Sequence, residues 1–245
     1  MTEQAILEGI ISIEAALSAN SRPIERVYIR RDERERDVMR LVRQAEAAGI
    51  PVERAAPEQI DVLAQGKSHG GVIAIVGQRR FVTLDALIAG KDRPLVVMLD
   101  GVEDPFNFGQ AVRAFYAAGA DGLVVRPRNW MSAAGVVARS SAGASERMPT
   151  AVAETTQEAA DFFRSRGLRI AVADKSRAVS IYEAELSGAL FVVIGGEKRG
   201  ITRSFADAAD VRLSIPYGRR FDQSLGTTAA SAVIAFEIMR QRGGN

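Results

Sequence analysis

The alternation of short apolar runs with helical patterns, from residue 95 onward, constrains the fold more than any other feature of this sequence. Strands that alternate with helices form a parallel sheet with helices on both faces. The predicted strands are Leu95–Leu99, Gly122–Val125, Leu168–Val172, Leu190–Ile194 and Val211–Ile215. The predicted helices are Phe108–Ala118, Ala133–Ser141, Thr156–Ser165, Thr202–Ala209 and Leu225–Arg240. The last helix begins with the small residues GTTAAS, which allow another backbone or a ligand to approach closely.

The first part of the chain predicts a second, smaller α/β unit. Its expected helices are 10–17, 33–48 and 57–63, and its expected strands are 26–29, 50–52 and 72–76. We therefore predict a domain over residues 1–77, a linker over 78–93 and a larger domain over 94–245. The linker is polar at both ends and contains the short apolar helix LDALIAG.

The composition excludes several classes of protein. The 245 residues include no cysteine and a single histidine, His69, so we expect neither a disulfide nor a metal site. No apolar run approaches the roughly 20 residues that a membrane span needs, so we expect no membrane association. The N-terminal residues lack the basic and then apolar pattern of a signal peptide, which favours a cytoplasmic protein.

Ligands of parallel sheets bind beyond the carboxyl ends of the strands, and three segments follow predicted strands in this way. They are DGVEDPFNFG, GGEKRG and PYGRRFDQSLG. Gly195 and Gly200 have the spacing of a phosphate-binding loop, but Ile201 stands where such a loop needs its lysine. The sequence also lacks a dinucleotide-binding glycine fingerprint after a strand. Neither ATP hydrolysis nor dinucleotide binding is therefore expected, and a simple turn is the structural alternative for Gly195 and Gly196.

The same three segments resemble, in order, the three motifs of the SpoU (TrmH) family of RNA ribose 2'-O-methyltransferases. The first motif matches DPFNFGQAVRAFYAAG, the second VVIGGEKRGIT and the third LSIPYGRRFDQSLGTTAA. RSSAGASERMP, between the first two, is similar to the family's serine-rich segment. In the N-terminal unit, KSHGGVIAIV resembles the end of the substrate-binding domain that many members carry.

The resemblance implies an α/β fold of the SPOUT type, in which the C-terminal segment passes through a loop to form a deep trefoil knot. It implies S-adenosylmethionine as the cofactor, RNA as the substrate, with rRNA favoured over tRNA, and a homodimer. By the same resemblance, the cofactor lies against backbone at Gly195, Gly196, Ile215, Leu225 and Gly226.

The resemblance also names the residues expected to act in catalysis, namely Arg113, Asn107, Glu197 and Ser224. A ribose hydroxyl is a weak nucleophile, so a protein can help by positioning it and by removing its proton. Because arginine normally stays protonated, we expect Arg113 to position phosphate and hydroxyl, and we leave the base unassigned. Arg113 serves either its own cofactor or that of a partner subunit. The structural alternatives are a surface cation for Arg113, a helix cap for Asn107 and a turn residue for Glu197.

The candidate RNA contacts are Arg30, Arg31, His69 and Arg139. The net charge of +2 is small, but arginines cluster between residues 22 and 43 and again between 126 and 147. Arginine can grip phosphate with two donors. Acidic residues interleave with the first cluster, so a solvated helix face is an equally good interpretation of it. For His69 we expect a structural role or an RNA contact.

One position favours an alternative function. Where the family commonly has serine, leucine and asparagine, this chain has Ser224, Leu225 and Gly226, and Tyr217 replaces the usual methionine. The change to glycine removes a side chain that can both donate and accept hydrogen bonds. An RNA-binding or ribosome-assembly factor with weak or no methyl transfer therefore stands as the alternative to a methyltransferase.

Overall fold

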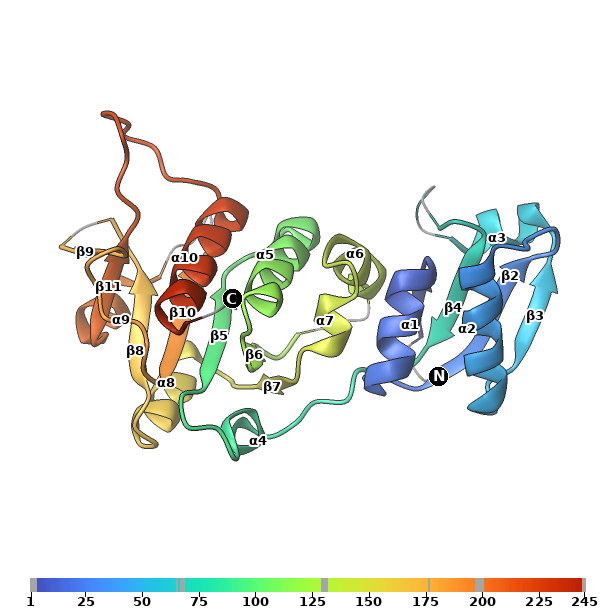
Figure 1. Cartoon of the computed structure of the whole chain (residues 1–245), viewed down its shortest axis with the longest axis horizontal. Helices are drawn as coiled ribbons and strands as arrows, with labels where there is room; N and C mark the ends of the chain where they lie inside the picture. Colours follow the sequence, from blue (N-terminus) through green and yellow to red (C-terminus); the bar gives the residue numbers. More distant parts are fainter. Residues whose placement is uncertain are drawn as a thin grey trace. The chain divides into compact units, whose positions relative to one another are not determined.

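The computed structural model describes residues 4–64, 66, 69–128, 132–175, 177–196 and 201–243. They belong to two compact units, whose elements are labelled in Figure 1. Unit 1 comprises residues 1–80 and 129–147, and unit 2 comprises residues 81–128 and 148–245. Within the described part of the chain, no helix has both the length and the apolar character of a membrane span.

Unit 1 contains a four-stranded sheet in the order β1-β4-β2-β3. Strand β4 runs antiparallel to β1 and β2, and β3 runs parallel to β2. The strands are β1 (Ala5–Glu8), β2 (Ile24–Arg30), β3 (Val52–Ala55) and β4 (Val72–Val76). The helices of the same segment are α1 (Ile10–Ala19), α2 (Arg36–Ala47) and α3 (Pro57–Leu63). The sequence did not predict β1, because its short apolar run stands directly before the apolar start of α1, where periodicity does not separate a strand from a helix.

Residues 129–147 group with unit 1, although the predicted boundaries place them in the larger domain. Within this segment, α6 (Ala134–Ser140) contacts β1, and α7 (Ala144–Arg147) contacts α1. Ala134 and Ala138 belong to the same apolar core as residues of β1, α1 and β4. A Cβ atom at Gly143 would lie only 2.7 Å from that of Ala15, so the short turn between α6 and α7 packs tightly on α1.

A buried cluster of charges fastens the end of this segment to unit 1. The Glu146 carboxylate accepts hydrogen bonds from Arg22, at 2.9 Å to each oxygen, and from the Ser21 hydroxyl at 2.5 Å. Arg79 lies 3.5 Å from the same carboxylate. Burial opposes ionisation of Glu146, but the charges of Arg22 and Arg79 and the hydrogen bonds outweigh it and lower its pKa.

Unit 2 contains a seven-stranded sheet in the order β7-β6-β5-β10-β8-β11-β9, and every neighbouring pair is parallel. Its strands are β5 (Leu95–Asp100), β6 (Gly122–Val125), β7 (Thr150–Val152), β8 (Arg169–Ala173), β9 (Val179–Ser180), β10 (Leu190–Gly195) and β11 (Val211–Ser214). The predicted parallel α/β fold is therefore confirmed. Strands β7 and β9 were not predicted, because they have only three and two residues.

Helices cover both faces of this sheet. On one face, α8 (Thr156–Arg164) and α9 (Arg203–Ala208) pack with alternate strand residues such as Met98 and Phe191. The intervening residues Leu95 and Val97 are also fully buried. The other helices of unit 2 include α5 (Pro105–Ala117) and α10 (Thr227–Gln241), which pack against each other, and α10 also contacts β10. Because both faces of these strands are buried, their residues are almost all apolar, which explains the continuous apolar runs in the sequence.

The segment 78–93, expected to be a linker, carries part of the unit 2 core. Its helix α4 (Leu84–Ile88) contacts β5, β6 and β7, and Leu87 is fully buried. A Cβ atom at Gly122 would lie 2.7 Å from a methyl group of Leu87, so a glycine makes room for this side chain. The apolar residues of LDALIAG pack into the core of unit 2, and they, rather than the polar ends of the segment 78–93, determine where this segment lies.

We expect Glu146→Ala to lower the free energy of unfolding by about 3–5 kcal/mol, because it leaves buried arginine charge uncompensated. The contribution of Glu146 is present above the pKa of an unfolded glutamate and is lost as pH falls through its lowered folded pKa. Urea unfolding between neutral and acid pH would measure both effects.

The control is Glu53→Ala, which breaks the exposed Arg26–Glu53 pair and should cost less than about 1 kcal/mol. Equal losses in the two variants would contradict a stabilising role for the buried cluster.

Candidate functional site

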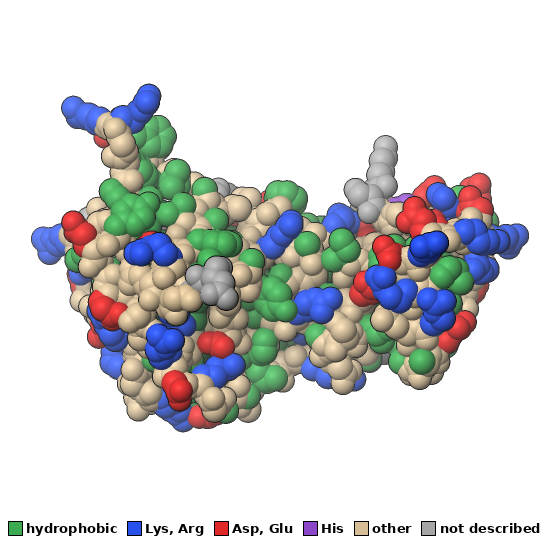
Figure 2. Space-filling model, in the orientation of Figure 1, with side chains coloured by type: hydrophobic (Ala, Val, Ile, Leu, Met, Phe, Trp, Pro, Cys, Tyr) green, Lys and Arg blue, Asp and Glu red, His purple; other side chains and the backbone are tan. Residues whose placement is uncertain are grey.

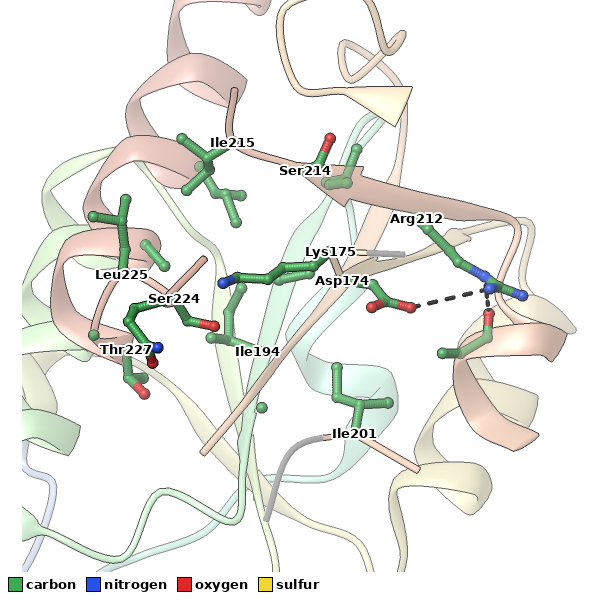
Figure 3. Close-up of a pocket in the computed structure, with 18 of the residues that line it drawn as sticks. Asp174, Lys175, Ile194, Ile201, Arg212, Ser214, Ile215, Ser224, Leu225 and Thr227 are labelled. Carbon is green, nitrogen blue, oxygen red and sulfur yellow. Dashed lines mark hydrogen bonds and ion pairs between the residues drawn. The ribbon is translucent and has the colours of Figure 1, made fainter. Parts of the chain in front are cut away.

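A cavity of about 1320 Å³ lies at the carboxyl ends of three parallel strands of unit 2. Residues after β8, β10 and β11 line it, together with the first turns of α10. Figure 3 shows these side chains around one space, with Ile194, Ile215 and Leu225 among them. A typical small-molecule site occupies about 300–1,000 Å³, so this cavity has room for a cofactor and part of a second molecule.

The predicted cofactor residues line this single cavity. They are Gly195, Gly196, Ile215, Leu225 and Gly226, and the predicted catalytic residue Ser224 lies with them. Their surroundings combine branched apolar side chains with exposed backbone. This composition suits a flat, partly apolar ligand whose polar edges hydrogen-bond to the main chain.

Gly196 can only be a glycine, because two loops meet at this residue. Its N–H donates a 2.7 Å hydrogen bond to the carbonyl oxygen of Asp100, the last residue of β5. A Cβ atom at Gly196 would overlap the carbonyl group of Gly101 and lie 2.8 Å from the nitrogen of Val102. Gly101 itself has a φ of +73°, which favours glycine. The loops that follow β5 and β10 are therefore in direct backbone contact, and a simple turn does not explain Gly196.

The loop between β11 and α10 is held at its base by side chains. The Tyr217 hydroxyl accepts a 3.1 Å hydrogen bond from the Leu225 N–H. Lys175, which follows β8, donates from Nζ to the carbonyl oxygen of Asp222 at 3.1 Å and lies 6.0 Å from the centre of the Tyr217 ring. The rings of Tyr217 and Phe221 are 5.9 Å apart. These contacts fix the wall of the cavity that carries Ser224, Leu225 and Gly226.

Sequence reasoning missed the contribution of the segment after β8. Asp174 and Lys175 line the cavity, and Asp174 lies 4.0 Å from Arg212 on β11. Figure 3 shows Arg212 and Asp174 side by side, and Arg212 also pairs with Asp207 and donates to the carbonyl oxygen of Ala206 at 2.8 Å. The signal was present, because the rule for the carboxyl ends of parallel strands applies to β8 as it does to β5, β10 and β11.

The residues of the first motif lie on α5, outside the set that lines the cavity. The carboxylate of Asp104 caps this helix by accepting a 2.7 Å hydrogen bond from the Asn107 N–H. Asn107 therefore stands three residues inside the helix, and the alternative that it serves as the cap is wrong. Arg113 is exposed, and no described residue forms a hydrogen bond or ion pair with its side chain. Glu197 and Gly200 of the second motif lie outside the described residues.

Some of the predicted RNA contacts in unit 1 already form ion pairs with acidic residues of the protein, and others form none with the described residues. Arg30 lies 2.7 Å from Asp32, and Arg139 pairs with the buried Glu8. His69 accepts from the Gly71 N–H at Nδ1, at 3.1 Å, and lies 3.1 Å from Asp61 at Nε2. These contacts are compatible with the structural role that the sequence suggested for His69, and an RNA contact by His69 stays a prediction. Arg31 is exposed, and among the described residues nothing pairs with its guanidinium group.

Comparison with protein families accounts for both units. A model of the SpoU rRNA Methylase family matches residues 94–236, and a model of the RNA 2'-O ribose methyltransferase substrate-binding domain matches residues 6–82. The chain belongs to the SpoU rRNA methylase family. The predicted resemblance is confirmed, and the protein is a SpoU family methyltransferase with an N-terminal substrate-binding domain.

Relatives are similar over the whole chain. The protein is 29% identical to a Shewanella oneidensis protein named 23S rRNA (guanosine-2'-O-)-methyltransferase RlmB, over 99% of each chain. It is 31% identical to the Haemophilus ducreyi protein of the same name, again over 99% of each.

Solved structures share the fold. A Sinorhizobium meliloti rRNA methyltransferase with bound AdoMet has a TM-score of 0.80 and 23% identity, over 97% of this chain and 87% of that one. The Streptomyces viridochromogenes SpoU methyltransferase AviRb, in complex with AdoMet, has a TM-score of 0.80 and 21% identity, over 98% and 90%.

We expect Gly196→Ala to lower the free energy of unfolding of this family member by about 1–3 kcal/mol, because the added methyl group overlaps the backbone of Gly101. Gly188→Ala is the matched control, since a Cβ atom there meets nothing within 4 Å. Urea unfolding of both variants measures the difference. Equal stability would show that the two loops can separate without cost.

Proposed function

We propose that this protein transfers a methyl group from S-adenosylmethionine to the 2'-hydroxyl of a guanosine ribose in 23S rRNA. The observation that carries the proposal is the cavity at the carboxyl ends of β8, β10 and β11, which gathers described residues of the second and third family motifs. The names of the full-length relatives support 23S rRNA and guanosine as the substrate. tRNA is a less favoured substrate.

The residues of the cavity fit S-adenosylmethionine. Ile194, Ile215 and Leu225 offer apolar surface to a purine ring, and Gly195 and Gly196 line the same cavity without a side chain that would hold a ligand away. The N-terminus of α10 also borders the cavity at Gly226 and Thr227 and favours a negative group such as a carboxylate. When bound, this cofactor supplies an electrophilic methyl group on a sulfonium centre.

The side chains of this chain then have to bring the ribose to the cofactor. Arg113 has no hydrogen-bond or ion-pair partner among the described residues, so its guanidinium group can hold the phosphate and hydroxyl of the target nucleotide. Asn107 orients the ribose or Arg113 through its amide group. Ser224 lies in the wall of the cavity. The role proposed for Glu197, which lies outside the described residues, is to pair with a basic group across the cleft. Such positioning supplies much of the rate enhancement when the nucleophile is weak.

A homodimer would explain why Arg113 does not line the cavity of its own chain. Helices α5 and α10 pack side by side, and each exposes large apolar side chains. Phe106 and Tyr116 on α5 are 56% and 38% exposed, and Phe236 on α10 is 45% exposed. Burying this surface against a second copy would place Arg113 at the interface, where it can serve the partner's cofactor.

We also propose a trefoil knot, a cytoplasmic location and the predicted roles of the two domains. The close contact of Gly196 with Gly101 and the small residues at the start of α10 are compatible with a threaded chain. In this arrangement the domain over residues 1–77 selects the RNA, and the domain over 94–245 carries the chemistry. Arg30, Arg31, His69 and Arg139 remain its proposed RNA contacts, with Arg31 the most available of them.

The alternative is an RNA-binding or ribosome-assembly factor with weak or no methyl transfer. The specific observation in its favour is Gly226, which lines the cavity and has no side chain where the family commonly has asparagine. Its φ of −59° is open to any residue, so backbone conformation does not require glycine at this position.

We expect Arg113→Ala to reduce methyl transfer to unmodified 23S rRNA by about a hundredfold or more, because it removes a charged donor that positions the reacting group. The measurement is incorporation of label from S-adenosylmethionine, with the product nucleotide analysed for 2'-O-methylation. Arg93→Ala is the control. It removes the same charge just before β5, at the amino ends of the parallel strands and so away from the cavity at their carboxyl ends.

Cofactor binding without transfer to 23S rRNA or tRNA would favour the assembly-factor function. A protein that does not bind S-adenosylmethionine at all would overturn the assignment of the cavity.

A further inference from the structure

The loop over residues 216–226 is the most exposed part of the site. Figure 1 shows it extending away from the sheet between β11 and α10. Every residue from 218 to 226 is exposed, and the Phe221 side chain is 54% exposed. Arg219 and Arg220 lie in its middle, and Figure 2 shows basic side chains at the end of this projection.

The charges of this loop are not used within the described structure. Arg212, deeper in the same cavity, is paired with Asp207 and Asp174. By contrast, no described residue forms a hydrogen bond or ion pair with the side chains of Arg219 and Arg220. Asp222 is the single acid between residues 216 and 226, so this loop carries a net positive charge.

Two further arginines continue this charge along the cavity. Arg177 and Arg203 line it, both are exposed, and no described residue forms a hydrogen bond or ion pair with their side chains. The cavity therefore has a basic margin on more than one side. Such a margin favours a polyanion over a neutral or cationic ligand.

Three contacts connect the loop to itself and to the segment after β8. Tyr217 holds the Leu225 N–H, Lys175 holds the carbonyl oxygen of Asp222, and the Tyr217 ring packs near that of Phe221. An exposed aromatic ring between arginines and a cavity is the arrangement that binds single-stranded nucleic acid, in which bases stack on the ring and phosphates meet the cations.

We propose that residues 216–226 form an RNA clamp next to the cofactor cavity, in which Arg219 and Arg220 bind phosphates adjoining the target nucleotide and Phe221 stacks on an unpaired base. The proposal deepens the proposed function and rests on it for the identity of the RNA. Ser224, Leu225 and Gly226 of the same loop line the cavity, so a nucleotide held there has neighbours within reach of the tip. The clamp would thus favour targets in single-stranded loops of the RNA.

The test compares Arg219→Ala/Arg220→Ala with the control Lys91→Ala/Arg93→Ala, which removes the same charge from the segment just before β5. Binding is measured to an unmodified 23S rRNA transcript and to single-stranded oligouridylate over a range of salt concentrations. The logarithm of the binding constant falls linearly with the logarithm of the salt concentration. We expect this negative slope to become shallower by about 1.4 in the loop variant, at about 0.7 for each of two lost phosphate contacts. The control should keep the slope of the original protein, and so should Arg219→Lys/Arg220→Lys.

Phe221→Ala should weaken oligouridylate binding by roughly tenfold to a hundredfold without changing the salt slope, and Phe221→Trp should restore it. Binding of S-adenosylmethionine by Arg219→Ala/Arg220→Ala, measured by calorimetry, should stay within about twofold of the original protein, which also shows that the variant is folded.

An unchanged salt slope in the loop variant would contradict the clamp. If the original protein still transfers methyl groups in that case, the proposed function is retained without the clamp. Loss of RNA affinity in the loop variant, with no methyl transfer by the original protein, would support the clamp and contradict the proposed function. Loss of methylation on ribosomal particles with unchanged binding to both naked RNAs would overturn the clamp in favour of a protein partner.

Discussion

The backbone contact between Gly196 and Gly101 is the constraint on which the rest of the site depends. The carbonyl group of Gly101 occupies the space that a side chain at position 196 would need. The backbones of the loops after β5 and β10 are therefore in van der Waals contact at this point. The hydrogen bond from Gly196 to Asp100 holds this contact at the edge of an all-parallel sheet. Residues at the carboxyl ends of the neighbouring strands β8 and β11 line the remaining walls of the same cavity.

A second constraint explains how the chain is divided between its two units. Glu146 ends a segment that leaves the sheet after β6 and returns to it at β7. Its buried contacts with Arg22 and Arg79 commit that segment to unit 1, since without Glu146 the two buried arginine charges would be left uncompensated. The substrate-binding unit therefore includes residues from the middle of the methyltransferase sequence, beside the N-terminal domain.

The arginines of the chain fall into two groups according to their partners. Some neutralise carboxylates within the fold, as Arg22, Arg139 and Arg212 do. Others have no partner among the described residues and lie on exposed segments, as Arg113 and Arg219 do. Because a desolvated or paired cation has little left to offer a phosphate, net charge says less about RNA binding than this division does.

The sequence by itself determined the parallel α/β fold, the family and the segments after β10 and β11 that line the cavity, because apolar periodicity and motif spacing are properties of local chain segments. Its bounds for β4, β6 and α3 agree with the structure, whereas it missed β1, β7, β9 and the short helix α7 and placed β3 two residues too early. The tertiary structure alone decided that Asp104 rather than Asn107 caps α5, that residues 129–147 join unit 1, and that Lys175 belongs to the site. Each of these depends on contacts between residues distant in sequence or on competition between neighbouring polar groups, which no local pattern records.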